Sequence, residues 1–179
     1  MKNRQTIELG DSEIVLIRLV KGLKSNKEIV EQMLELEKPD VVTLPLSPEG
    51  LEDMRAWDGN VQDIPLSAED IMYLRGLERF GGGDLPPPEH TFALERAGEL
   101  GIPVEAMDMD EDQFSKLFVD NVSIFELRRR SKLPKKLVKH EIIAETPEEY
   151  ALAWETLLSD NRGLMVVEKA REKLSLIHI

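Results

Sequence analysis

The chain of 179 residues contains no cysteine. Disulfide bonds, thiolate metal sites and cysteine nucleophiles are therefore excluded, and the composition fits a reducing compartment. Aromatic residues make up only 5% of the sequence. No apolar run approaches the roughly 18 residues that a membrane-spanning helix needs, and the first residues do not resemble a signal peptide. We therefore expect a cytoplasmic protein that does not interact with a membrane.

Basic side chains are outnumbered, because 23 Lys and Arg stand against 35 Asp and Glu and leave a formal net charge of −12. This balance argues against a protein whose whole surface binds nucleic acid or anionic lipid. Hydrophobic residues make up 41% of the chain, which is enough to bury one sizeable core. We therefore expect a single domain over residues 1–179.

Helical and strand patterns alternate along the chain. The apolar, β-branched run 14–20 is typical of a strand covered on both faces. A capping box of Ser25 and Glu28 then predicts a helix that ends before Pro39, and residues 41–46 predict a second buried strand. Further helices are expected at 48–57, from 67, at 91–100, from 110, at 121–130 and at 146–173, with strands at 102–107 and 174–179.

Residues 80–90 contain three consecutive glycines and three consecutive prolines. This composition predicts a flexible internal loop, since glycine frees the backbone and proline removes its donors. A phosphate-binding loop is not expected, because the glycines do not follow a strand and no Lys-Ser/Thr pair follows them. The whole pattern predicts a helix-rich α/β domain with a small, largely parallel or mixed sheet of about four core strands and helices packed around it.

Three motifs stand out in the order and spacing in which they occur: KPDVV at 38–42, AGELGIPVEAMD at 97–108 and DNRGLM at 160–165. In this arrangement the chain resembles the TraB/PrgY family, whose wider group includes the TIKI proteases and the erythromycin-esterase-like and ChaN-like folds. The resemblance covers nearly the whole chain and implies the α/β fold of that family.

The resemblance also implies which positions would carry the family's chemistry. These are a His after the first strand, a Glu at the end of the second, an Arg after the Asp that ends the third, and a second His near the C-terminus. Here Lys21 and Pro45 occupy the first two positions, Met109 follows the matching Asp108, and His178 is the only counterpart of the last. Lys, Pro and Met cannot together bind a metal or transfer a proton at neutral pH. We therefore expect a member that kept the fold and lost the chemistry.

Acidic residues follow the third buried strand, where ligands of open α/β sheets bind. Asp108 and Asp110 could hold Mg²⁺ or Ca²⁺ there, but the calcium-loop pattern is not matched. Because Asp110 can instead cap the following helix, we favour that role and expect no metal and no cofactor. Lys21 is expected to form a partly buried ion pair with Asp108 or Asp110, and His178 remains a binding candidate.

The segment 127–140 contains seven basic residues and no acidic one. The rest of the chain has 16 basic and 35 acidic residues, so its formal charge is −19. The segment could bind an acidic partner, a phosphate-rich ligand or RNA. We favour neutralisation of the protein's own acidic surface, within the chain or between copies, since no aromatic residue is present to stack on bases. Nucleic acid is expected at most locally. The seven residues are Arg128, Arg129, Arg130, Lys132, Lys135, Lys136 and Lys139.

These observations favour a non-catalytic TraB-like domain that acts by binding an unidentified ligand or protein partner and that forms homo-oligomers. One alternative is a hydrolase or metal-dependent peptidase of the TraB-like group, with a rearranged site that uses Asp108, Asp110 and His178. Another is a self-assembling structural protein, because acidic and basic segments can complement each other between copies. Whether the protein is an enzyme is not decided by the sequence, although the loss of the family's His, Glu and Arg positions argues against it.

Overall fold

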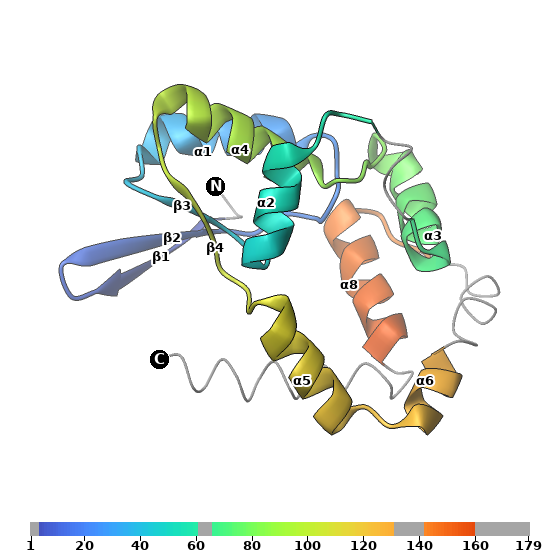
Figure 1. Ribbon diagram of the computed structural model, residues 1–179. Helices are drawn as coiled ribbons and strands as arrows, with labels where there is room; N and C mark the ends of the chain where they lie inside the picture. Colours follow the sequence, from blue (N-terminus) through green and yellow to red (C-terminus); the bar gives the residue numbers. More distant parts are fainter. Residues whose placement is uncertain (1–3, 61–65, 131–141, 160–179) are drawn as a thin grey trace.

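The computed structural model describes residues 4–60, 66–130 and 142–159 (Figure 1). It confirms a helix-rich α/β fold with four strands in this part of the chain. None of the helices in these ranges is long and apolar enough to cross a membrane. The elements described there are β1 (Arg4–Leu9), β2 (Ser12–Ile17), α1 (Asn26–Glu37), β3 (Val42–Leu44), α2 (Pro48–Ala56), α3 (Ala68–Leu77), the 3₁₀ helix η2 (Glu78–Phe80), α4 (Pro88–Leu100), β4 (Val104–Ala106), α5 (Glu111–Asn121), α6 (Ile124–Arg130) and α8 (Pro147–Ser159).

The four strands form two small sheets rather than one. β1 and β2 pair antiparallel as a hairpin, whereas β3 and β4 pair parallel. The hairpin forms because Gly10 takes a left-handed conformation (φ +61°) in a two-residue turn. Residues 12–17 can therefore pair with residues 4–9, the strand that directly precedes them. Residues 14–17 are in a strand, as predicted, but the expectation that this strand is covered on both faces is wrong, because Ile14 and Leu16 of β2 are exposed.

A first core cluster surrounds the parallel pair β3–β4. Helices α1 and α4 lie side by side, and α2 and α4 both contact β4 (Figure 1). Apolar helix faces thus cover a parallel pair of strands, as in other α/β folds. The buried residues of the cluster are Val30, Leu34, Leu44, Leu51, Ala93, Ala97 and Val104.

A second core cluster joins α3, α8 and the segment between β2 and α1. Val20 and Leu23 from this segment pack with Leu77, Tyr150 and Trp154. The Tyr150 hydroxyl donates a hydrogen bond of 3.1 Å to the backbone carbonyl of Tyr73 in α3. Burial of an aromatic ring together with a partner for its hydroxyl is the usual way in which tyrosine stabilises a core. The segment 20–30 therefore contributes apolar side chains to both clusters.

Several helices begin at a residue whose side chain caps them. Ser47 accepts from the Gly50 N–H, Asp110 accepts from the Gln113 N–H as expected, and Ser67 forms a capping box with Asp70. Ser25 is the exception. It precedes α1 but makes no capping hydrogen bond, so the capping box predicted there is wrong.

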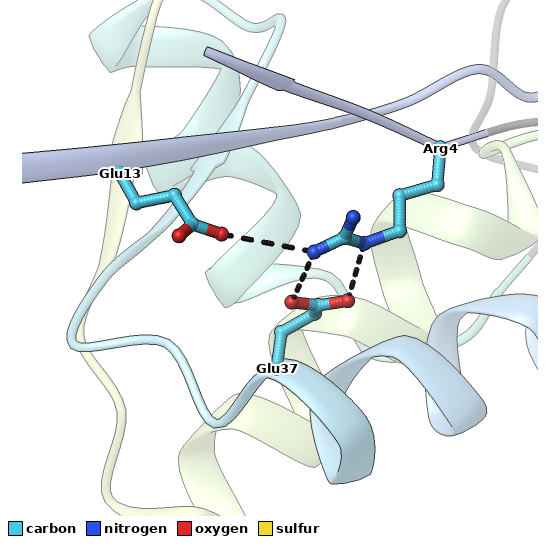
Figure 2. Close-up of polar contacts among 3 residues, drawn as sticks. All are labelled: Arg4, Glu13 and Glu37. Carbon is cyan, nitrogen blue, oxygen red and sulfur yellow. Dashed lines mark hydrogen bonds and ion pairs between the residues drawn. The ribbon is translucent and has the colours of Figure 1, made fainter. Parts of the chain in front are cut away.

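The hairpin is tied to the body of the protein by Arg4, as Figure 2 shows. Its guanidinium donates two hydrogen bonds to the Glu37 carboxylate at the end of α1, at 2.6 and 3.0 Å, and Glu13 lies 3.7 Å away. The hydrogen bond from Arg4 lowers the pKa of Glu37, and the same bond raises the pKa of Arg4. This bidentate geometry orients the hairpin against α1.

We predict that Glu37→Gln loosens the hairpin with little effect on global stability, because exposed ion pairs contribute little to folding. Amide hydrogen exchange in residues 4–17 should accelerate, while Glu35→Gln one half-turn away should leave it unchanged. Folding lowers the pKa of Glu37. The contribution of the Arg4–Glu37 pair to stability is therefore present above the pKa that Glu37 has in the unfolded chain, and it is lost as pH falls through the pKa that Glu37 has in the folded protein. Equal exchange rates in both variants at neutral pH would contradict the prediction.

Candidate functional site

A buried carboxylate lies where the loop 81–87 enters α4. Glu89 is in the first turn of α4, behind Pro88, and only 6% of its surface is exposed. Its carboxylate accepts hydrogen bonds from the Gly22 N–H at 2.9 and 3.3 Å and from Asn26 Nδ2 at 3.0 Å. A buried charge is tolerated when such donors replace the water that it has lost. Glu89 thereby joins the start of α4 to the segment before α1.

Asn26 completes this network from the first position of α1. It is 1% exposed, and its Nδ2 donates to the Val20 carbonyl at 2.7 Å as well as to Glu89. Gly22 takes a left-handed conformation (φ +79°), which few other residues adopt without strain. A Cβ at Gly22 would also lie 3.1 Å from the carbonyl oxygen of Asp84. The close contact between the turn at residues 20–26 and the loop at Asp84 therefore requires glycine at position 22.

The glycine- and proline-rich loop is hydrogen-bonded to the segment before α1. The Lys24 N–H donates to the Gly82 carbonyl at 3.2 Å, and the Asp84 N–H donates to the Gly22 carbonyl at 2.9 Å. Gly82 and Pro87 are buried. Helix α4 consequently begins at Pro88, three residues earlier than the sequence predicts, since proline suits the first helical turn.

His90 is the titratable neighbour of this network. It is partly buried, and its Nδ1 is buried without a hydrogen-bond partner among the described residues. Burial lowers the pKa of His90; the negative charge of Glu89 opposes this change, and the positive charge of Lys21 reinforces it. A neutral imidazole with a free ring nitrogen can accept a proton or a hydrogen bond.

Burial also keeps the two tyrosines of the chain protonated. It raises the pKa of Tyr73 to about 12 and raises the pKa of Tyr150 as well. Tyrosine in an unfolded chain titrates at about pH 10. The contribution of the two raised pKa values to the free energy of unfolding is therefore fully present below that pH, and it is lost as pH rises through the folded pKa values.

We therefore predict that tyrosinate absorbance stays low between about pH 10 and 12 until the helical circular dichroism signal is lost. The same titration in denaturant is the control and should give tyrosinate near about pH 10. Formation of tyrosinate at that pH in a protein that is still folded would contradict the prediction.

The structure corrects the ion pair expected at the strand ends. Lys21 is exposed and forms no ion pair with a carboxylate in the part of the chain that the structure describes. The reason is that β2 pairs with β1 and not with the parallel strands; the positive charge of Lys21 acts on His90 instead. Asp108 accepts from the Met109 N–H at 2.9 Å, and Asp110 caps α5 as favoured above.

Several other predicted residues lie outside the described ranges. His178, the last predicted strand 174–179 and the Asp160–Met165 motif are among them. In residues 4–60, 66–130 and 142–159, no group of three or more His, Asp or Glu gathers to hold a metal ion. Of the basic segment, Arg128, Arg129 and Arg130 belong to α6, whereas Lys132, Lys135, Lys136 and Lys139 are not described.

Glu89 and Asn26 were not predicted from the sequence as residues of a site. An acidic residue in a first helical turn is ordinarily explained by the helix dipole, so Glu89 carries no distinctive signal. An Asn beside a capping position is equally ordinary. The residues Gly22 and Glu89 are 67 positions apart, and only the packing of α4 against α1 brings them together.

A second candidate surface is the helical arm formed by α5 and α6 (residues 111–130). The two predicted helices are present, but α5 has no buried residue. Val119, Ile124 and Phe125 are 76%, 65% and 72% exposed, and the rings of Phe114 and Phe118 lie 5.9 Å apart on α5. Clustered exposed apolar side chains mark surfaces that contact other molecules.

Comparisons of the chain with protein-family models, with curated proteins and with solved structures find no match.

Proposed function

We propose that this chain is a non-catalytic binding domain, similar to the TraB/PrgY family, and that it holds a protein partner on the arm formed by residues 111–130. The observation that carries the proposal is the exposure of Val119, Ile124 and Phe125 on consecutive helices. Such residues cost solubility unless a partner covers them, and aromatic side chains are enriched in protein interfaces. The lack of cysteine is compatible with action in the cytoplasm.

The arrangement of Glu89 supports a role without catalysis. A general acid or base needs an oxygen free to exchange a proton with a substrate. Both carboxylate oxygens of Glu89 instead accept hydrogen bonds from the protein itself, from Gly22 and Asn26. The carboxylate therefore serves to join two segments of the fold.

The proposal is tested by site-specific photo-crosslinking in the cells that make the protein. A photoreactive amino acid at Phe125 should yield a protein adduct, whereas the same group at Glu95, an exposed position on α4, should not. Mass spectrometry identifies the adduct, and either a second copy or a different protein supports the proposal. No adduct at Phe125, or equal adducts at both positions, would overturn the binding role.

Metal analysis of protein purified without chelator tests the absence of catalysis. We expect no stoichiometric transition metal. Bound Zn²⁺, Mn²⁺ or Fe that is lost in Asp108→Ala would instead favour the hydrolase alternative, since such ions commonly activate water in hydrolases.

A further inference from the structure

The two helices of the arm formed by residues 111–130 differ in charge. Helix α5 has three acidic residues and one lysine, a formal charge of −2, whereas α6 has three arginines and one glutamate, a formal charge of +2. The charge of α6 is opposite in sign to that of the whole chain, which is −12. Helix α6 therefore favours a contact of different chemistry from the rest of the protein.

The exposed apolar residues of α6 lie one helical turn before its arginines. Ile124 precedes Arg128 by four residues, and Phe125 precedes Arg129 by four. Positions at this spacing lie on the same side of a helix. Ile124 and Phe125 are 65% and 72% exposed, and Arg128 is exposed as well. Helix α6 thus presents apolar surface and positive charge side by side.

We infer that the partner held on the arm docks on α6 through an acidic amphipathic segment, whose apolar side chains cover Ile124 and Phe125 and whose carboxylates pair with the arginines one turn further on. The inference rests on the proposed function and names the chemistry of its partner. An apolar surface alone fits any apolar partner. A guanidinium beside it favours a carboxylate, which it can bind with two parallel hydrogen bonds.

The same charges disfavour two other occupants of α6. A second copy of this chain would bring a charge of −12 against another of −12, and these repel each other. Nucleic acid would bring phosphates to the arginines but no aliphatic side chain to cover Val119 and Ile124, which are 76% and 65% exposed. Salt at physiological concentration screens charges beyond about 8 Å. The attraction to α6 therefore requires carboxylates in the docking segment, and the partner as a whole need not be acidic.

Photo-crosslinking of charge variants tests the inference on the full chain, with a photoreactive amino acid at Phe125 as the probe. Arg128→Glu/Arg129→Glu should lower the yield of the protein adduct at least tenfold, because like charges then meet across the contact. Arg128→Lys/Arg129→Lys keeps the charge and should lower the yield by less than about threefold. Arg18→Glu/Arg75→Glu is the matched control. It changes the net charge equally, at exposed positions outside the arm, and should leave the yield unchanged.

Arg128→Gln/Arg129→Gln separates loss of the contact from loss of the helix. Negative charges near the C-terminus of a helix destabilise it, whereas glutamine is a good helix former. This variant should lower the yield at least threefold and leave the helical circular dichroism signal unchanged. A Phe125 adduct of equal yield in the wild type, the Glu variant and the Gln variant would overturn the acidic partner and leave the proposed binding role intact. No adduct in any background would overturn both.

The crosslinked segment identifies the occupant. Mass spectrometry should assign the adduct to a different protein, at a segment in which carboxylates lie next to apolar residues. Replacing these carboxylates with lysine should restore the adduct of Arg128→Glu/Arg129→Glu, because opposite charges then face each other again. An adduct with a second copy of this chain, or one that ribonuclease removes, would overturn the inference.

Discussion

Replacing Gly76 with alanine should lower the free energy of unfolding by about 2 kcal/mol, although alanine is the better helix former. A Cβ at Gly76 in α3 would overlap the hydroxyl and ring of Tyr150. Tyr150 is 3% exposed and is held by its hydrogen bond to the Tyr73 carbonyl, so it cannot move aside without disturbing the second core cluster. Overpacking costs about 1 to 3 kcal/mol, and the direct overlap with Tyr150 places this variant at the upper end of that range. The helix-propensity gain of about 1 kcal/mol offsets only part of this cost, which leaves the net loss of about 2 kcal/mol.

Gly98→Ala is the matched control for this prediction. Gly98 also lies in a helix, α4, but a Cβ there would meet nothing within 4 Å. This variant should therefore be unchanged or more stable by up to about 1 kcal/mol. Chemical denaturation of both variants gives the comparison. In Gly76→Ala/Tyr150→Phe the two losses should be less than additive, since both act on one contact; equal stability of the two glycine variants would contradict the overlap.

Glu89→Ala should destabilise the protein by about 3 kcal/mol, because it leaves two buried donors unsatisfied at about 1 to 3 kcal/mol each. The donors are the Gly22 N–H and Asn26 Nδ2, and both residues are buried. The loss should appear locally as well, as faster amide exchange in residues 20–26 and 82–84, since Glu89 holds the first of these segments against α4.

Glu95→Ala separates the network from a general effect of removing negative charge from α4. Glu95 is exposed on the same helix, so its replacement should change stability little. Glu89→Gln should fall between the two variants, because the amide keeps one acceptor oxygen but presents a second donor to Asn26. A double-mutant cycle with Asn26→Ala should show coupling, whereas additive losses would indicate that the hydrogen bonds contribute nothing specific.

Local patterns in the sequence were sufficient to predict most helices. The Ser47, Ser67 and Asp110 caps, and the glycine after α4, each act on neighbours within a few residues, so they can be recognised without knowledge of the fold. Apolar runs likewise predicted both strands of the parallel pair, 42–44 and 104–106. The α/β class follows from these local elements because an apolar helix face and an apolar strand can be buried only against each other.

The assignment of strands to sheets and the assembly of the Glu89 network depended on tertiary structure. An apolar run has the same sequence pattern whether it joins a central sheet or, as residues 12–17 do, an exposed hairpin; packing alone decides which. Lys21 was expected beside Asp108 because the strand before it was assigned to the same sheet as the strand before Asp108; instead its positive charge acts on His90. A glutamate in a first helical turn has no sequence mark that distinguishes a solvated side chain from a buried one. Only the approach of α4 to the turn before α1 places Glu89 within hydrogen-bonding distance of donors more than sixty residues away.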